Sequence, residues 1–434
     1  MGEQSSQQCN NGSVSMTRIK IITLCFVILA VLVFRFIQHY QSKPLAIDGE
    51  TVRFTTTLLA DPKLFSNRQQ VTARIFRNGS VFISLPRFPQ YHYGETLLIE
   101  GKITIRELSN ISTNNNAMIT KNQTIIAIYP TKIELTKKDN FFLSLVYSFR
   151  QQTARIYERF LSPNHAKLLL GIVFGVKTQM EEKYTEMLQK TGVLHVTAAS
   201  GMNVTLLGGV LATGLGMLFR RQVALFVSIA VLGVYAVIAG LEASILRATI
   251  MISLAFVAQS IGRQYKGEYG LFLAGLGLLV VSPEQLFDIG FQLSFLATAG
   301  ILWLPPFFAP LVSRLPLKEE VLVTLAAQLA TLPLLLFYFG GFSLWSFFAN
   351  ILIAWAIPPL MLLGGLAAVS GVILRPLGEA VALLVLPLLM YFDIVIGFFY
   401  HLPGFVSFTT FPLSFVVAYY CFLLSAMFVK KRVA

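Results

Sequence analysis

Four ionisable side chains stand inside long apolar segments of this sequence: His195, Arg247, Asp288 and Asp393. A charged or titratable group in hydrocarbon is costly, and it is usually retained where it faces a cavity, a substrate pathway or a partner group. These residues are therefore the first candidates for function. The alternative is that they only hold helices together, as polar side chains often do in membrane bundles.

Hydroxyl and amide side chains accompany three of these residues. Ser200 and Asn203 are three positions apart and would share a helix face, whereas His195 is rotated from Ser200 by about 140° on an ideal helix. Gly201 is a candidate for a helix break, which membrane proteins tolerate where the backbone lines a cavity. The remaining polar neighbours are Thr197 near His195, Ser244 beside Arg247, and Gln292 and Ser294 beside Asp288.

The elements that must position these groups are predicted to be membrane-spanning helices. Hydrophobic residues make up 55% of the 434 residues and charged residues 13%, which does not suit a soluble protein. The first apolar run, from Ile21 to Phe34, follows Arg18 and Lys20 and predicts an uncleaved signal anchor. With nine further spans the total is about ten; the nine cover residues 193–217, 222–240, 243–262, 268–282, 287–308, 319–340, 346–370, 377–400 and 408–429.

The positive charges alternate along these connections. If the first of the nine spans starts outside, every cytoplasmic connection is basic, from Arg220 and Arg221 to the tail at Lys430–Arg432. The outward connections carry only Glu242, Glu284 and His401 as ionisable groups. The positive-inside rule then predicts cytoplasmic N- and C-termini in the cell membrane, and it explains most of the formal charge of +13. On this map His195, Arg247 and Asp288 lie toward the outer side.

Residues 45–137 are predicted to form an extracytoplasmic all-β domain, because apolar residues alternate at period two. Asn78-Gly79 lies between two alternating runs and predicts a hairpin. Five or six strands in this length suit a small OB-like barrel. Residues 48–134 hold ten Lys and Arg against seven Asp and Glu, a net +3, so single-stranded DNA binding and a purely structural role stay open for this domain.

A linker over residues 138–192 separates the β domain from the bundle, which covers 193–434. Phe141–Leu161 predicts an amphipathic helix on the membrane surface, and Leu168–Val176 a half-inserted segment. Gly171–Thr178 lacks the spacing of a phosphate loop. Cys9, Cys25 and Cys421 lie far apart, so we expect no disulfide framework, no metal and no cofactor. Residues 1–42 form the tail and the anchor.

Three stretches resemble the ComEC family of competence proteins, with order and spacing maintained from about residue 166 to 424. They are LHVTAASGMNV over residues 194–204, ASILRA over residues 243–248, and PEQLFDIGFQLSF over residues 283–295; weaker similarity occurs at 328–333 and 339–350. Two features depart from the family pattern. Asn203 stands where the family usually has a second histidine, and the sequence reaches Ala434 without the metallo-β-lactamase-like domain that many members append.

The resemblance implies inward transport of single-stranded DNA across the cytoplasmic membrane in natural transformation. Phosphates need a wet path lined by hydrogen-bond donors and occasional cations. We expect that path to include His195, Ser200, Gly201, Asn203, Arg247, Asp288, Gln292 and Ser294. We expect no enzyme activity, and a DNA receptor, a nuclease and a cytoplasmic motor as separate proteins. Whether the chain forms an oligomer stays open.

Two functions of other classes remain as alternatives. A secondary transporter of a small solute or lipid would also explain buried charge and broken helices, but internal repeat symmetry is not visible in the sequence. An intramembrane serine protease would use Ser200, which then needs a base within hydrogen-bond reach.

Overall fold

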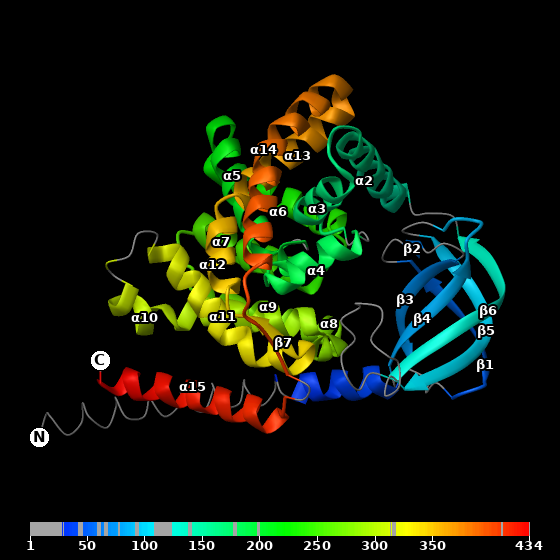
Figure 1. The fold of residues 1–434 in the computed structure, drawn as a ribbon, viewed down its shortest axis with the longest axis horizontal. Helices are drawn as coiled ribbons and strands as arrows, with labels where there is room; N and C mark the ends of the chain where they lie inside the picture. The colour runs from blue at the N-terminus through cyan, green and yellow to red at the C-terminus, as the bar shows by residue number, and fades with distance from the viewer. Residues whose placement is uncertain are drawn as a thin grey trace, which may run out of the picture.

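The computed structural model describes one chain with an N-terminal β sheet and a larger helical bundle (Figure 1). Coordinates are described for residues 28–433. The gaps in this range are residues 29, 42–46, 59–61, 65–67, 77–78, 92–94, 108–123, 138–140, 177–179, 198–199, 313, 315–317 and 409–410. The N-terminal tail and the first part of the predicted anchor lie outside the described residues, and residues 30–41 are helical.

The β domain is a six-stranded sheet in the order β1-β5-β6-β4-β3-β2. Its strands are β1 (Thr51–Thr57), β2 (Lys63–Leu64), β3 (Arg68–Phe76), β4 (Gly79–Pro86), β5 (Thr96–Glu107) and β6 (Thr124–Lys137). All pairs are antiparallel except β4 and β6, which run parallel. The predicted hairpin is confirmed, because Phe76 of β3 faces Gly79 of β4. The two residues between them lie outside the described part of the chain.

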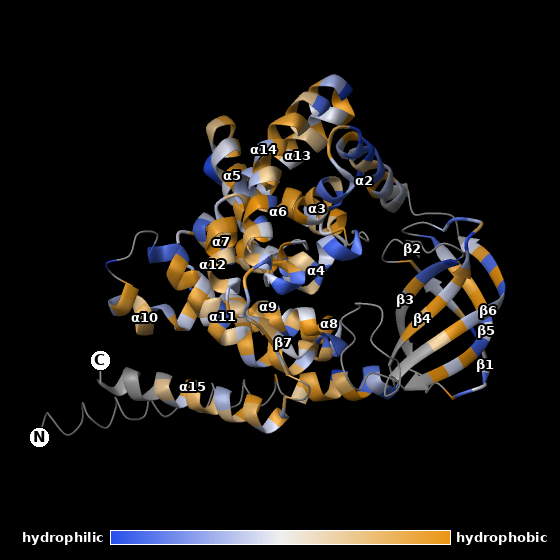
Figure 2. Cartoon of the chain, in the orientation of Figure 1, coloured by the Kyte–Doolittle hydropathy of each residue, from blue (hydrophilic) through white to orange (hydrophobic). Residues whose placement is uncertain are grey.

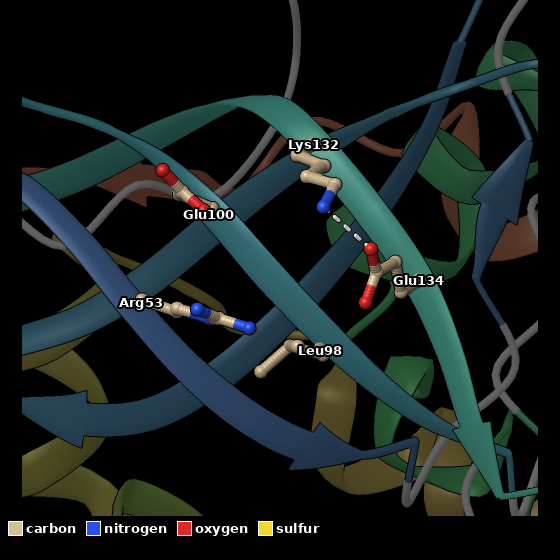
Figure 3. Close-up of a pocket in the computed structure, with 5 residues that line it drawn as sticks. All are labelled: Arg53, Leu98, Glu100, Lys132 and Glu134. Atoms are coloured by element: carbon tan, nitrogen blue, oxygen red, sulfur yellow. Dashed lines mark ion pairs between the residues drawn. The ribbon is translucent and has the colours of Figure 1, made fainter.

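One face of the sheet carries the domain core. Its buried side chains alternate along the strands, as period-two patterning requires; they include Val71, Val81, Ile83, Leu97, Ile99 and Ile128. The other face of β1, β5 and β6 has a shallow depression lined by four charged residues and a leucine (Figure 3). The charges balance, since Arg53 and Lys132 stand beside Glu100 and Glu134. Lys132 hydrogen-bonds to Glu134 at 2.6 Å and holds the pKa of the Glu134 carboxyl below its usual range.

The bundle begins with three helices that the chain forms before its long apolar segments. They are α2 (Phe141–Phe160), α3 (Pro163–Phe174) and α4 (Glu182–Lys190). Helix α2 contacts α13 and α14, and its Tyr157 hydroxyl donates to the carbonyl of Gly364 on α13 at 2.7 Å. The predicted helix over this range is therefore present. Its position on a membrane surface stays a prediction, although its contacts show one side packed into the bundle.

The remaining elements follow as apolar helices, which Figure 2 shows as mainly hydrophobic ribbons. They are η2 (Leu194–Thr197), α5 (Gly201–Leu218), α6 (Arg221–Ile238), α7 (Ala243–Ser260), α8 (Gly267–Val281), η3 (Pro283–Phe287), α9 (Ile289–Trp303), α10 (Pro305–Val312), α11 (Lys318–Phe339), β7 (Gly341–Ser343), α12 (Ser346–Ala354), α13 (Ile357–Ile373), α14 (Arg375–Tyr400), β8 (Phe405–Ser407) and α15 (Leu413–Val433).

The helices support a multi-pass membrane protein. Within the described residues, five helices are individually long and apolar enough to cross a bilayer: α5, α6, α7, α11 and α14. Two bent pairs, α9 with α10 at 58° and α12 with α13 at 48°, raise the number to seven. Two shorter apolar helices, α8 and Leu413–Ala426 of α15, fall in the other predicted spans. A total of about ten spans stays a prediction.

Candidate functional site

Arg247 lies on the second turn of α7, close to the start of that helix. Its guanidinium Nη1 donates to the carbonyl oxygen of Ser294 and to the hydroxyl of Thr298, both on α9. The Ser294 hydroxyl in turn donates to the hydroxyl of Ser244 on α7, at 3.1 Å. Arg247 is only 7% exposed. The beginnings of α7 and α9 are therefore joined by one buried arginine and its neutral partners.

The charge of Arg247 has no counter-ion in the part of the chain that the structure describes. The ion pairs found there involve other residues, and the buried Nε of Arg247 has no hydrogen-bond partner. A buried positive charge that has no carboxylate partner costs free energy, so most buried charges are paired with a group of opposite charge. The site therefore keeps a positive charge for which the described structure supplies only hydroxyl and carbonyl oxygens.

Gly201 gives this guanidinium room at the start of α5. A Cβ at Gly201 would lie 2.7 Å from Nη2 of Arg247, which is closer than real contacts allow. Ser200 is the N-cap residue with extended backbone, so the helix begins beside the arginine. The free N–H groups and the dipole of a helix N-terminus favour negative charge. Both features favour an anion at the same place.

Asn203, one turn further along α5, connects this region to α3. Its side-chain amide donates to the carbonyl of Ile172 at 2.6 Å and accepts from the Ser200 hydroxyl at 3.3 Å. The Tyr235 hydroxyl of α6 donates to the carbonyl of Val173 at 2.8 Å. These two carbonyls belong to the last turn of α3, where no intrahelical donor remains. Asn203 and Tyr235 therefore fasten the end of α3 to the bundle.

Hydrogen bonds and one close approach connect five of the eight predicted path residues, whereas the other three are not among these contacts. Ser200, Gly201, Asn203, Arg247 and Ser294 form the group just described. Asp288 caps α9 by accepting from the backbone N–H of Phe291 at 3.0 Å. The Gln292 amide donates to the Leu286 carbonyl at 2.8 Å and accepts from the Tyr338 hydroxyl at 3.0 Å. Asp288 therefore caps α9, and Gln292 joins α9 to α11 through Tyr338.

His195 does not begin the first long helix. It lies in the 3-10 turn η2 and is exposed, whereas α5 starts only at Gly201. The predicted span from residue 193 therefore starts too early. The physical reason is the break at Ser200-Gly201, since the small glycine lets α5 begin against Arg247. The predicted helix break at Gly201 is confirmed.

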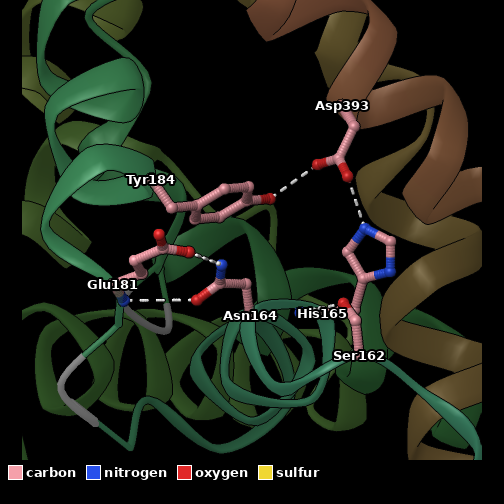
Figure 4. Close-up of polar contacts among 6 residues, drawn as sticks. All are labelled: Ser162, Asn164, His165, Glu181, Tyr184 and Asp393. Carbon is pink, nitrogen blue, oxygen red and sulfur yellow. Dashed lines mark hydrogen bonds and ion pairs between the residues drawn. The ribbon is translucent and has the colours of Figure 1, made fainter.

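A second polar cluster was only partly visible in the sequence (Figure 4). Asp393 of α14 accepts from the Tyr184 hydroxyl of α4 at 2.7 Å, and its other oxygen lies 2.5 Å from Nε2 of His165 on α3. The His165 side chain is 11% exposed and that of Asp393 is 37% exposed. Burial raises the pKa of Tyr184, and the negative Asp393 raises it further, so this hydroxyl remains a donor at neutral pH.

Neighbouring contacts complete this cluster, which we call the Asp393 clamp after its residues His165, Tyr184 and Asp393. The Ser162 hydroxyl caps α3 by accepting from the N–H of His165, at 3.3 Å. Asn164 donates to the Glu181 carboxylate at 3.1 Å and accepts from the Glu181 N–H at 3.2 Å. The clamp therefore holds α3 and α4 together and fastens both to α14. Asp393 was a candidate from the sequence because it is an isolated acidic residue in an apolar run, whereas nothing in the sequence pointed to His165 or Tyr184.

Comparison with known proteins shows the family of this chain. A family model described as Competence protein matches residues 172–433. The chain belongs to the competence protein family. Two curated relatives are similar to it: ComE operon protein 3 of Bacillus subtilis strain 168, 27% identical over 272 residues, and the uncharacterized protein YcaI of Escherichia coli K12, 25% identical over 205 residues.

These matches cover parts of longer proteins. They include 62% of this chain and 34% of ComE operon protein 3, and 43% of this chain and 26% of YcaI. The chain thus matches about a third or less of the length of these relatives. No solved structure matches it. The family match contains α5, α7 and α9, so the Arg247 group lies inside the part of the chain that the family model matches.

Proposed function

We propose that this chain forms a path for single-stranded DNA across the cytoplasmic membrane, with Arg247 as a principal contact for the DNA phosphates. The observation that carries this proposal is the buried guanidinium with only neutral oxygen partners. Each nucleotide of the strand carries one phosphate charge, and an arginine fork matches a phosphate in charge and geometry. The start of α5 adds backbone N–H groups at the same place.

The described conformation is closed. Arg247 is 7% exposed and Asn203 is 3% exposed, so neither is accessible to a strand as the molecule stands. Transport then requires helices around Arg247 to separate. The side chains that already border this position, Ser200 and Ser294, are small and polar, and they suit a path that becomes wet when it opens.

For orientation, we propose that both termini are cytoplasmic and that the β domain is outside. Contacts between connections support this map. Strand β7 pairs with β8, and both come from connections that the charge pattern assigns to the outside. His39, which follows the anchor, lies 3.3 Å from Glu284 in a third such connection. In Figure 1 α15 extends away from the β sheet.

We also propose that the β domain is an OB-like barrel. Its order β1-β5-β6-β4-β3, with β4 and β6 parallel, supports this topology, with β2 as a short additional strand. The charge-balanced face in Figure 3 lacks the basic groove that nonspecific single-strand binding uses, so we do not assign DNA binding to this face.

DNA uptake tests the proposed function. A strain from which the gene for this chain has been deleted should regain uptake of labelled DNA when the chain is supplied from a plasmid. The purified chain should bind single-stranded DNA less tightly as the salt concentration increases. The purified chain should leave duplex DNA intact when Mg²⁺, Mn²⁺ or Zn²⁺ is present. Normal uptake in the deletion strain would contradict the proposed path. Metal-dependent cleavage that a single substitution removes would contradict the expectation that the chain has no nuclease activity.

A further inference from the structure

A fully buried glutamine shapes the loop that follows β4. The two N–H groups of the Gln69 amide are shared among three carbonyl oxygens, those of Pro86 and Pro89, each at 2.8 Å, and that of Arg87 at 3.1 Å. The amide oxygen of Gln69 accepts from the N–H of Tyr91 at 3.2 Å. Gln69 is 0% exposed. One buried amide thus fixes the backbone of residues 86–91, and such a network costs free energy unless each bond is made.

This loop holds a large apolar side chain in solvent. Phe88 is 69% exposed, and the Arg87 guanidinium carbon lies 5.7 Å from the centroid of its ring. Arg68, whose backbone faces Pro86, is exposed at the same end of the sheet. The fixed loop therefore presents one largely exposed aromatic ring with the Arg87 guanidinium next to it.

The register of the sheet shows which end of the domain carries the loop. Because β4 runs parallel to β6, with Ile83 opposite Ile128, the chain beyond Pro86 continues in the direction in which β6 leads to Lys137. Only three residues separate Lys137 from the start of α2, a span of at most roughly 15 Å. Nine residues into α2, Arg150 donates to the carbonyl of Ile238 at the end of α6. The loop after Pro86 thus points along the direction in which the chain leaves the β domain for the membrane bundle.

We propose that Arg87 and Phe88 anchor the β domain on the surface of the bilayer. An aromatic ring suits the boundary between acyl chains and headgroups, and a neighbouring arginine suits lipid phosphates. A lipid surface fits better than a nucleic acid because the described loop offers one exposed ring, whereas nonspecific single-strand sites stack successive bases on several. In this orientation the face around Lys132 and Glu134, where positive and negative charges balance, is turned to solvent.

A fluorescence experiment on the full chain in lipid nanodiscs tests this anchor. The native cysteines are replaced by serine, and an environment-sensitive dye is attached through Gln90→Cys, beside the ring, or through Lys102→Cys, an exposed control on β5. Lipids that carry a headgroup nitroxide should quench the dye at position 90 several-fold more than at position 102. Phe88→Ser should reduce the quenching at position 90 to the control value, and Phe88→Trp should restore it.

Three outcomes would overturn the inference. Equal quenching at positions 90 and 102 in the parent chain would show that the loop does not reach lipid. Quenching that survives Phe88→Ser would show that the ring is not the anchor. If single-stranded DNA relieves the quenching at position 90 and also shifts the dye emission there in detergent, the loop binds nucleic acid instead of lipid. The circular dichroism of each variant should match that of the parent chain.

Discussion

Arg247 and Asp393 are both charged residues on apolar helices, but their surroundings differ. Asp393 has a histidine and a tyrosine, each bonded to one of its two oxygens. Arg247 has only a carbonyl, a hydroxyl and an unsatisfied Nε. The Asp393 clamp also joins three helices and is partly exposed, whereas Arg247 is buried beside the start of α5.

This difference separates a structural charge from a functional one. A matched charge stabilises the fold by holding elements together, and its loss should reduce stability first. A buried charge without a counter-ion contributes little to stability and is retained at a cost, which favours a role with an anionic substrate. The four predictions below test this distinction, from the largest expected effect to the smallest.

Arg247→Gln should cause the largest loss of function. The variant keeps side-chain hydrogen bonding but removes the charge, and hydrogen bonds to charged groups contribute about 1.5 to 3 kcal/mol. DNA uptake per molecule in the membrane should therefore fall at least about tenfold. The measurement is uptake of labelled DNA divided by membrane abundance from quantitative immunoblots.

Arg247→Lys is the matched control for that variant. It restores the charge without the planar fork, so uptake should recover in part. If membrane abundance falls as much as uptake in Arg247→Gln, the arginine stabilises the fold as Asp393 does and is not a contact for DNA.

Asp393→Ala should give the largest loss of stability. It leaves His165 and Tyr184 without their acceptor and releases α3 and α4 from α14. Because the Asp393 side chain is partly exposed, we expect a cost of about 2 kcal/mol. The thermal unfolding midpoint in detergent should fall, and uptake should fall only in proportion to abundance. Uptake lost at full abundance and an unchanged midpoint would give Asp393 the role assigned to Arg247.

Gly201→Ala should displace Arg247 without removing it. The added methyl group would lie 2.7 Å from Nη2, and the end of a long side chain can move to relieve that contact. We expect a reduction in uptake of about threefold with near-normal unfolding, since displacement retains the charge. Gly209→Ala is the control, because a Cβ there meets nothing within 4 Å. Equal effects of the two substitutions would mean that the approach of Arg247 to α5 has no functional role.

Tyr184→Phe should have the smallest effect, a destabilisation of about 1 kcal/mol from one lost hydrogen bond. The folded pKa of Tyr184 lies above its unfolded value of about 10, so the stabilisation is complete below pH 10 and is lost as pH rises further. The difference in unfolding midpoint between parent and variant should therefore be constant from about pH 6 to 9 and shrink above pH 10. A difference that shrinks on acidification would show that another group governs the clamp.

Periodicity and charge predicted most of the helices and the β sheet, because both depend on local sequence. The strand pattern predicted the hairpin between β3 and β4, and each of the nine predicted bundle spans overlaps an observed helix or bent pair. The start of the first span was wrong, since a 3-10 turn precedes Gly201 and places His195 outside α5. The bends after α9 and α12 were not predicted either.

The polar contacts were predictable only in part, because they join residues far apart in sequence. Ser244 and Ser294 were candidates, but their hydrogen bond links positions 50 residues apart. Nothing in the sequence marked Thr298, whose hydroxyl accepts from Arg247, as a candidate, because a single threonine in an apolar helix is common. His165 and Asp393 are 228 residues apart, and only the packing of α3 against the bundle brings them together.

The most direct test of the central claim is to find where a strand in transit touches this chain. Single-stranded DNA with photoreactive 5-iodouracil would be stalled during uptake, irradiated, and the adducts mapped by mass spectrometry. We predict adducts in peptides from the first turns of α5, α7 and α9, and a strong reduction of these adducts in Arg247→Gln relative to Asp393→Ala at equal abundance. Adducts confined to other helices, or equal adduct yields in the two variants, would contradict the assignment of Arg247 to the DNA path.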